Sequence, residues 1–139
     1  MSGGAGGEQD LSGHWHGFYN MPVQGPPTAF EAELLDTGGL LSGETSEEGD
    51  SPDCFGLILH AVIDGRRDGV RVLFTKRYDY LPRADYAILY EGKLAPGGDE
   101  IEGTWTSPGI WSGTFLMVRA RGEAAAEEAK VEEKVPLGR

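Results

Sequence analysis

The residues of this 139-residue chain that could do chemistry lie in short segments where apolar and polar side chains alternate. Lys76 is the most informative, because alternation places it on the same face as Val70, Val72, Phe74 and Tyr78. An ammonium group that faces inward must be paired or must shift its pKa. Two interpretations remain open: Lys76 neutralises a carboxylate of a bound ligand, or it lies at the end of its strand and reaches water.

Aromatic and polar side chains on equivalent faces of other segments extend this candidate site. A mostly apolar cavity with a few polar groups is typical of a ligand pocket. The residues predicted to contact a ligand are Tyr19, Phe30, Phe74, Lys76, Tyr78, Tyr86, Tyr90, Trp105 and Phe115. Aromatic residues of this kind also serve as packing, so a filled interior is an alternative.

Histidine and cysteine offer weaker candidates. His14 and His16 share a face of one predicted strand, and His60 is a third potential zinc ligand. If Trp15 points inward, however, both flanking histidines point outward, and the strand of His60 is not their neighbour. Cys54 has no nearby base in the sequence that would activate it as a nucleophile. We therefore predict no metal site, no cofactor and no catalytic residue.

The content of turn-forming residues indicates which elements position these side chains. The chain contains 22 Gly and 8 Pro, which disfavour helices, while its hydrophobic fraction of 39% suffices for a core. Turn residues separate the alternating segments about every ten to fifteen positions, as in β-sandwiches and barrels. The predicted strands span 13–20, 28–36, 40–46, 55–63, 69–78, 85–94, 99–106 and 111–121.

Short links between these strands favour antiparallel hairpins. The links Thr37-Gly38-Gly39, Asp64-Gly65, Asp68-Gly69 and Pro96-Gly97-Gly98-Asp99 supply the positive φ angles that tight turns need. Closing the sheet would remove its exposed edges. The predicted fold is therefore all-β: an eight-stranded antiparallel up-and-down β-barrel with a flexible or helical C-terminal tail.

Composition divides the chain into three parts. Residues 1–10 are predicted to be a flexible N-terminal segment, residues 11–121 the barrel domain, and residues 122–139 a charged tail whose Ala, Glu and Lys favour a solvated helix. The acidic run 44–53 lacks the spacing of a calcium loop and is predicted to form a mobile flap between the third and fourth strands.

Charge and hydropathy restrict the partners. A net charge of −11 disfavours binding to nucleic acid and to anionic membranes. The sequence shows neither a signal peptide nor a run of about 18 apolar residues that would span a membrane. We expect a soluble, cytoplasmic protein.

Two features resemble the calycin group of small barrels, which includes lipocalins, avidins and fatty-acid-binding proteins. They are Gly13-His14-Trp15 at the start of the first predicted strand and Arg119 near the end of the last. In that group a G-x-W motif begins the barrel, and a basic residue of the final strand packs across the Trp ring. The resemblance implies that Trp15 and Arg119 close the barrel, and a guanidinium does stack well on indole.

Within the group, the avidin-like barrels are most similar in length and in their short, Gly-bounded strands. This resemblance implies that the acidic flap covers a ligand. Biotin binding is not implied, because Gly17 and Met21 stand where avidins carry polar residues. The opening Gly13-His14-Trp15-His16-Gly17 is also similar to that of haem-binding nitrobindin-like barrels, but no His follows His60 to ligate iron.

Apolar residues on the opposite faces of the strands suggest association. Contiguous apolar patches are rare on monomers, so we expect a homodimer or higher homo-oligomer packed through the barrel wall. The residues predicted to lie there are Ile58, Val62, Leu73, Leu89, Leu116 and Val118.

These observations favour a non-catalytic barrel that binds a small hydrophobic or amphipathic molecule, with an anionic ligand as one option. One alternative is a lipocalin-like isomerase or cyclase that uses Tyr78, Tyr90 or Lys76 as acid or base. The other is a filled oligomeric barrel that acts as a structural or protein-interaction module through its acidic tail.

Overall fold

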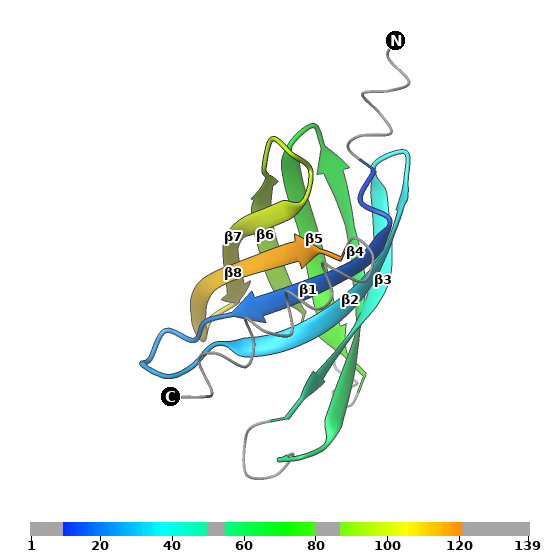
Figure 1. The fold of residues 1–139 in the computed structure, drawn as a ribbon. Helices are drawn as coiled ribbons and strands as arrows, with labels where there is room; N and C mark the ends of the chain where they lie inside the picture. Colours follow the sequence, from blue (N-terminus) through cyan, green and yellow to red (C-terminus); the bar gives the residue numbers. More distant parts are fainter. Residues whose placement is uncertain (1–9, 50–54, 80–86, 121–139) are drawn as a thin grey trace.

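The computed structural model describes residues 10–49, 55–79 and 87–120, which form a closed antiparallel barrel (Figure 1). Each strand pairs with the next one along the chain, and the last strand pairs with the first. The strands are β1 (Gly13–Tyr19), β2 (Thr28–Thr37), β3 (Leu40–Glu48), β4 (Ile58–Asp68), β5 (Arg71–Tyr78), β6 (Ile88–Leu94), β7 (Glu100–Ser107) and β8 (Trp111–Arg119). The predicted up-and-down barrel is confirmed.

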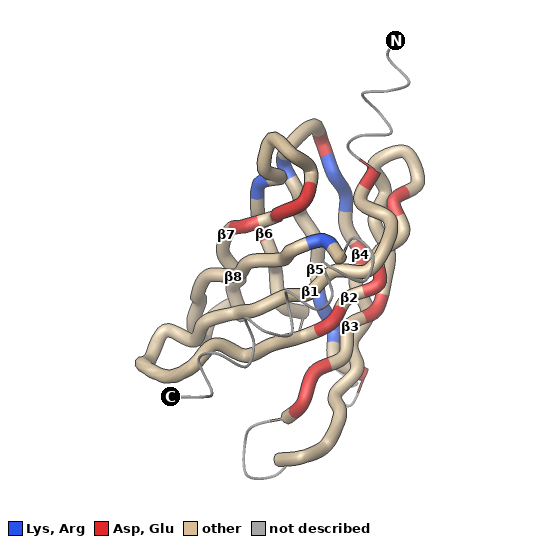
Figure 2. Tube along the Cα trace, in the orientation of Figure 1, with Lys and Arg blue, Asp and Glu red and all other residues tan. Residues whose placement is uncertain are grey.

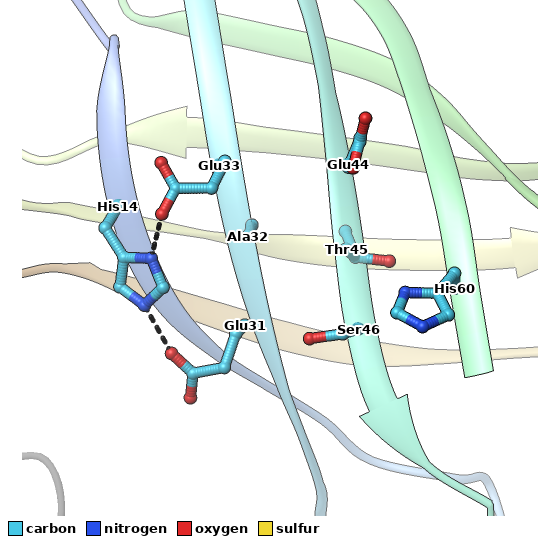
Figure 3. A pocket seen from close by; sticks show the side chains of 8 residues that line it. All are labelled: His14, Glu31, Ala32, Glu33, Glu44, Thr45, Ser46 and His60. Carbon is cyan, nitrogen blue, oxygen red and sulfur yellow. Dashed lines mark hydrogen bonds and ion pairs between the residues drawn. The ribbon is translucent and has the colours of Figure 1, made fainter. Parts of the chain in front are cut away.

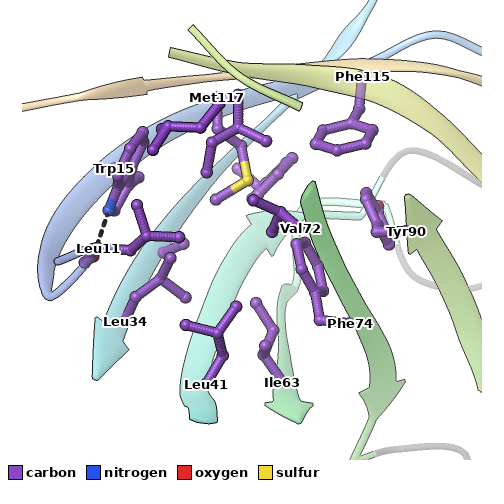
Figure 4. Close-up of a cluster of buried hydrophobic side chains, with 14 of the residues drawn as sticks. Leu11, Trp15, Leu34, Leu41, Ile63, Val72, Phe74, Tyr90, Phe115 and Met117 are labelled. Carbon is purple, nitrogen blue, oxygen red and sulfur yellow. Dashed lines mark hydrogen bonds between the residues drawn. The ribbon is translucent and has the colours of Figure 1, made fainter. Parts of the chain in front are cut away.

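Alternation of side chains determines which face of each strand is buried. On β2, Phe30, Ala32 and Leu34 point into the barrel, while Glu33 between them is exposed. The same period of two runs along every strand, because successive side chains of a strand point to opposite faces. The side chains of the core therefore come from alternate positions of all eight strands (Figure 4).

Several predicted strand boundaries differ from the structure, and two of the errors, at the ends of β4 and β3, change which residues belong to the sheet. This strand runs to Asp68 rather than ending at residue 63, and Gly65 pairs with Phe74 instead of forming a turn. A Cβ at position 65 would lie 2.0 Å from the backbone oxygen of Leu73, so glycine is needed for close approach of the strands. The turn itself is made by Gly69, whose φ is 63°.

The second error concerns the acidic run. β3 continues to Glu48, so residues 44–48 belong to the sheet rather than to a flap. Alternation buries Leu41, Thr45 and Glu47 and leaves Glu44 and Glu48 exposed. Residues 50–54, with Cys54, lie outside the described residues, as do 80–86 with Tyr86, the first nine residues and the tail from 121.

One end of the barrel is closed by the segment that precedes β1. Leu11 is fully buried, and its backbone oxygen accepts a hydrogen bond of 2.9 Å from the indole Nε1 of Trp15. The guanidinium of Arg119 lies 4.6 Å from the centre of the Trp15 ring and donates to the backbone oxygens of Asp10 and Ser12. Residues 10–12 are thus held across the apolar end of the interior (Figure 4).

Asp36 fixes the same segment from β2. Its carboxylate accepts hydrogen bonds from the backbone N–H groups of Leu11 and Gly39 and from Nε of Arg67, at 3.0, 2.8 and 2.8 Å. Burial by itself raises the pKa of the Asp36 carboxyl, but these hydrogen bonds and the charge of Arg67 outweigh it and hold the pKa below its usual value. The ionised form of Asp36 therefore stabilises the fold.

The outer wall carries several apolar side chains. Ile58, Val62 and Leu89 are exposed as expected, whereas Leu73, Leu116 and Val118 are half-buried. None of the described residues forms a helix long and apolar enough to cross a membrane.

Replacing Asp36 by Asn should lower the free energy of unfolding at neutral pH by about 2–4 kcal/mol, since Arg67 loses a buried partner. A depressed carboxyl pKa stabilises the fold above the unfolded-state value of about 4, and the effect is lost as the pH falls through the folded-state pKa. Urea unfolding at neutral and acidic pH should therefore show the difference between wild type and Asp36→Asn shrinking in acid.

The matched control is Asp64→Asn, because Asp64 pairs with Arg77 at 3.8 Å in an exposed position. This change should alter stability by less than about 0.5 kcal/mol. Equal effects of the two substitutions would contradict the role given to Asp36.

Candidate functional site

Lys76 lies inside the barrel with no exposed surface. Its Nζ donates a hydrogen bond of 3.0 Å to Oε1 of Glu47, which projects inward from β3. The interpretation in which Lys76 reaches water from the end of its strand is therefore wrong. The ammonium group is compensated by a carboxylate of the same chain, as burial of a charge requires.

Two tyrosines also donate hydrogen bonds to the carboxylate of Glu47. The hydroxyl of Tyr19 donates to Oε2 of Glu47 at 2.5 Å, and the hydroxyl of Tyr78 donates to Oε1 at 2.8 Å. Lys76 also donates to the hydroxyl of Tyr90, at the longer distance of 3.4 Å. We call Tyr19, Glu47, Lys76, Tyr78 and Tyr90 the polar cluster. It joins four strands, β1, β3, β5 and β6, across the interior.

Aromatic rings surround the ammonium group of this cluster. Nζ of Lys76 lies 4.3 Å from the centre of the Phe30 ring, and 5.0 and 5.1 Å from those of Tyr19 and Tyr78. These distances are within the range of cation–π attraction. Gly17 makes the arrangement feasible, because a Cβ there would lie 2.2 Å from the tip of the Phe30 ring. The aromatic side chains thus stabilise a charge that is shielded from water.

The environment determines how these groups titrate. Burial raises the pKa values of Tyr19, Tyr78 and Tyr90, and the negative charge of Glu47 raises them further. Burial lowers the pKa of Lys76, and the neighbouring Glu47 opposes that change. At neutral pH the three phenols therefore remain protonated and serve as hydrogen-bond donors rather than as bases.

The remaining predicted residues lie against the polar cluster. Phe74 stacks on Tyr90 with ring centres 4.8 Å apart, and the Phe115 ring meets both edge-on. Trp105 packs edge-on against Tyr19 and donates from Nε1 to the backbone oxygen of Asn20. All predicted contact residues that the structure describes thus form one connected group, and Tyr86 lies outside the described residues. Trp15 and Arg119 lie at the opposite, apolar end.

Glu47 is the member of this group that sequence reasoning missed. It lies one residue beyond the predicted end of its strand and within an acidic run, which suggested a solvated loop. Leu41, Gly43, Thr45 and Glu47 nevertheless continue one face in steps of two. The inward-facing Lys76 was the signal that could have identified Glu47, because a buried ammonium group requires a carboxylate on a facing strand.

The polar cluster lies toward the end of the barrel at which β1, β3, β5 and β7 end. Tyr19 and Tyr78 are partly exposed there, and Met21 and Ile88 pack against the core. A hollow of about 260 Å³ between β2, β3 and β4 at this end is lined in part by Phe30, Glu47 and Ile58. Glu31, Ser46 and Glu48 of the outer face also line it, so this hollow lies on the wall beside the cluster.

A second hollow, of about 200 Å³, lies on the outer wall over β2 and β3 (Figure 3). Its lining includes His14, Glu31, Glu33 and His60, which come from β1, β2 and β4. The two hollows adjoin each other, since Glu31 and Ser46 line both of them.

No protein-family model matches the sequence, and no curated protein matches it. The architecture itself places the chain among closed, eight-stranded, up-and-down antiparallel barrels, which is consistent with the resemblance to calycins.

The pairing of Lys76 with Glu47 predicts strong thermodynamic coupling. Either single change, Lys76→Met or Glu47→Gln, should lower the free energy of unfolding by about 3 kcal/mol or more, because each leaves a buried charge without its partner. The double variant should lose clearly less than the sum of the two, since neither charge then remains. Urea unfolding of the four proteins measures the coupling, and additive losses would contradict the pairing.

Proposed function

We propose that this protein binds a small, uncharged hydrophobic or amphipathic molecule at the end of the barrel that carries the polar cluster. The observation that carries the proposal is the compensated Lys76–Glu47 pair, held with phenols and aromatic rings below partly exposed Tyr19 and Tyr78. The opposite end is closed by residues 10–12, so the ligand enters at the end that carries the polar cluster. An apolar site with a few positioned polar groups is what small-ligand recognition requires.

Charge favours a neutral ligand over a carboxylate. Lys76 and Glu47 carry opposite charges 3.0 Å apart, so together they present no net charge to a ligand. An anion would have to replace Glu47 at Lys76, and it would leave the carboxylate of Glu47 without its cation. An anionic ligand, which the sequence leaves open, is therefore disfavoured.

Hydrogen-bonding capacity narrows the ligand further. Tyr19 and Tyr78 commit their protons to Glu47, so a ligand whose polar end can only accept hydrogen bonds finds no donor in these two phenols. A polar end that can donate, as a hydroxyl or amide N–H does, is the better match. Its apolar part would lie against Ile88 and the aromatic rings. The same protonated phenols make Tyr78 and Tyr90 poor general bases, which disfavours the isomerase alternative.

Two related dyes test this proposal. N-phenyl-1-naphthylamine is uncharged, and its 8-sulfonate derivative has the same rings with one negative charge. In about 0.15 M salt, which screens distant charges, the neutral dye should bind at least tenfold more tightly than the sulfonate. Fluorescence titration measures both. Tighter binding of the sulfonate would show that Lys76 acts as a free cation.

Adjacent residues of β6 provide a matched pair of variants that locate the dye. Ile88 points inward beside Lys76, whereas Leu89 pairs with Thr75 on the outer wall. Ile88→Trp should narrow the site and weaken binding of the neutral dye at least tenfold, while Leu89→Trp should leave it within twofold. If the two variants bind the dye equally well, the site does not lie at this end, and the filled-barrel alternative is favoured.

We also propose that copies of the barrel associate through the outer wall, because Ile58, Val62 and Leu89 are 58%, 46% and 39% exposed. Light scattering at micromolar concentration should give at least twice the chain mass of 14.9 kDa. Val62→Glu combined with Leu89→Glu should reduce it to a single chain. A monomeric wild type would contradict the association without affecting the dye prediction.

A further inference from the structure

The outer face of β1 and β2 gathers four side chains that the proposed ligand site does not use. His14 and His16 lie two residues apart on β1, and they are paired in register with Glu33 and Glu31 of β2, respectively. Alternation points all four away from the interior, because Trp15 between the histidines is buried. We call them the outer-wall cluster.

Within this cluster, two imidazole nitrogens converge on one carboxylate oxygen. Nε2 of His14 lies 2.5 Å from Oε1 of Glu31, and Nδ1 of His16 lies 2.9 Å from the same atom. The other nitrogen of His14, Nδ1, contacts the carboxylate of Glu33 (Figure 3). Nε2 of His16 is buried and has no hydrogen-bond partner in the described part of the chain.

We propose that His14, His16 and Glu31 bind a divalent transition-metal ion of the zinc type. Their ligating atoms all lie within 4.8 Å of one another. Ligands at 2.0–2.1 Å from a tetrahedral zinc ion are separated by roughly 3.3 Å, so the carboxylate of Glu31 needs to move outward by only about 0.5–1 Å. Rotation of one partly exposed side chain provides that movement.

Glu33 positions one of these ligands. A histidine that binds a metal through one ring nitrogen usually donates its other N–H to a carboxylate, which fixes the orientation of the ring. Glu33 occupies that place at Nδ1 of His14, while Nε2 faces Glu31. The cluster therefore supplies three metal ligands and a positioning residue from two neighbouring strands.

The surroundings favour a cation with an open coordination position. Acidic residues concentrate on β2 and β3, including Glu44 beside Glu33 (Figure 2). Two histidines with one carboxylate form a donor set that suits Zn²⁺, whereas Ca²⁺ and Mg²⁺ prefer oxygen ligands. The 200 Å³ hollow next to His14 and Glu31 leaves room for water as the fourth ligand.

His60 is not a ligand in this arrangement, although the sequence suggested it as the third histidine of a zinc site. Its strand is separated from β1 by β2 and β3, and adjacent strands lie about 4.8 Å apart, so His60 is about 14 Å away along the wall. It lines the far side of the hollow (Figure 3). Glu31 takes the third position instead.

The test uses the full chain without an affinity tag. Calorimetry with Zn²⁺ and absorption spectroscopy with Co²⁺ should show one ion per chain at micromolar affinity or better, and Mg²⁺ and Ca²⁺ should not compete. His14→Asn, His16→Asn and Glu31→Gln should each weaken binding at least tenfold. Glu33→Gln should weaken it less than a ligand substitution does, and the Co²⁺ spectrum should keep its intensity, as expected for a positioning residue.

His60→Asn is the matched control, because it removes a histidine from the same hollow, and Cys54→Ser removes the single thiol. Both should bind Zn²⁺ within twofold of wild type. Circular dichroism checks that each variant is folded, which an outer-wall substitution should permit. Absence of Zn²⁺ uptake, or an equal loss in His60→Asn and His14→Asn, would overturn the proposal.

Discussion

The organisation of the barrel interior depends on one compensated charge pair. Lys76 and Glu47 come from β5 and β3, which are not neighbours in the sheet, so their contact spans the interior rather than following the wall. A buried pair of this kind contributes less to stability than its short distance suggests, because both ions have lost their hydration. An arrangement of the interior that separated the two charges would leave both of them buried and unpaired, which is costly.

The charge pair also divides the interior into two halves of different character. Toward residues 10–12 the core is apolar, with Leu11, Trp15 and Met117 fully buried. Toward the other end, phenols and rings surround the pair, and polar atoms are satisfied mostly by one carboxylate. The difference between the halves follows from where Glu47 lies on β3, since alternation along that strand buries it among residues of the second half.

Much of this arrangement can be predicted from the sequence, and the exceptions have physical reasons. Period-two alternation in β2 and β5 identified the inward faces correctly, including that of Lys76. The predicted strand ends were wrong where a residue type suggested a turn or a loop but packing between strands required the strand to continue. Gly65 is needed for close approach of β4 and β5, and Glu47 is drawn inward by a lysine on another strand. Both depend on contacts between segments, which local composition does not contain.

The cluster on the outer wall also depends on contacts between segments that local composition does not contain. The spacing of His14 and His16 is visible in the sequence, but their partner Glu31 is specified by the register between β1 and β2. Residue type alone points to His60 as the third ligand. Strand register instead places the carboxylate of Glu31 opposite His16, and register depends on how the strands pair.

The seam between β1 and β8 has a consequence for how the chain folds. Every other pairing in the barrel joins strands that follow one another, whereas the seam brings Arg119 to Asp10, 109 positions away. The entropy lost in closing a loop grows with its length, so this pairing is the costliest to form. Contacts of such long range also slow folding. The stacking of Arg119 on Trp15 therefore stabilises the junction that the chain has most difficulty in closing.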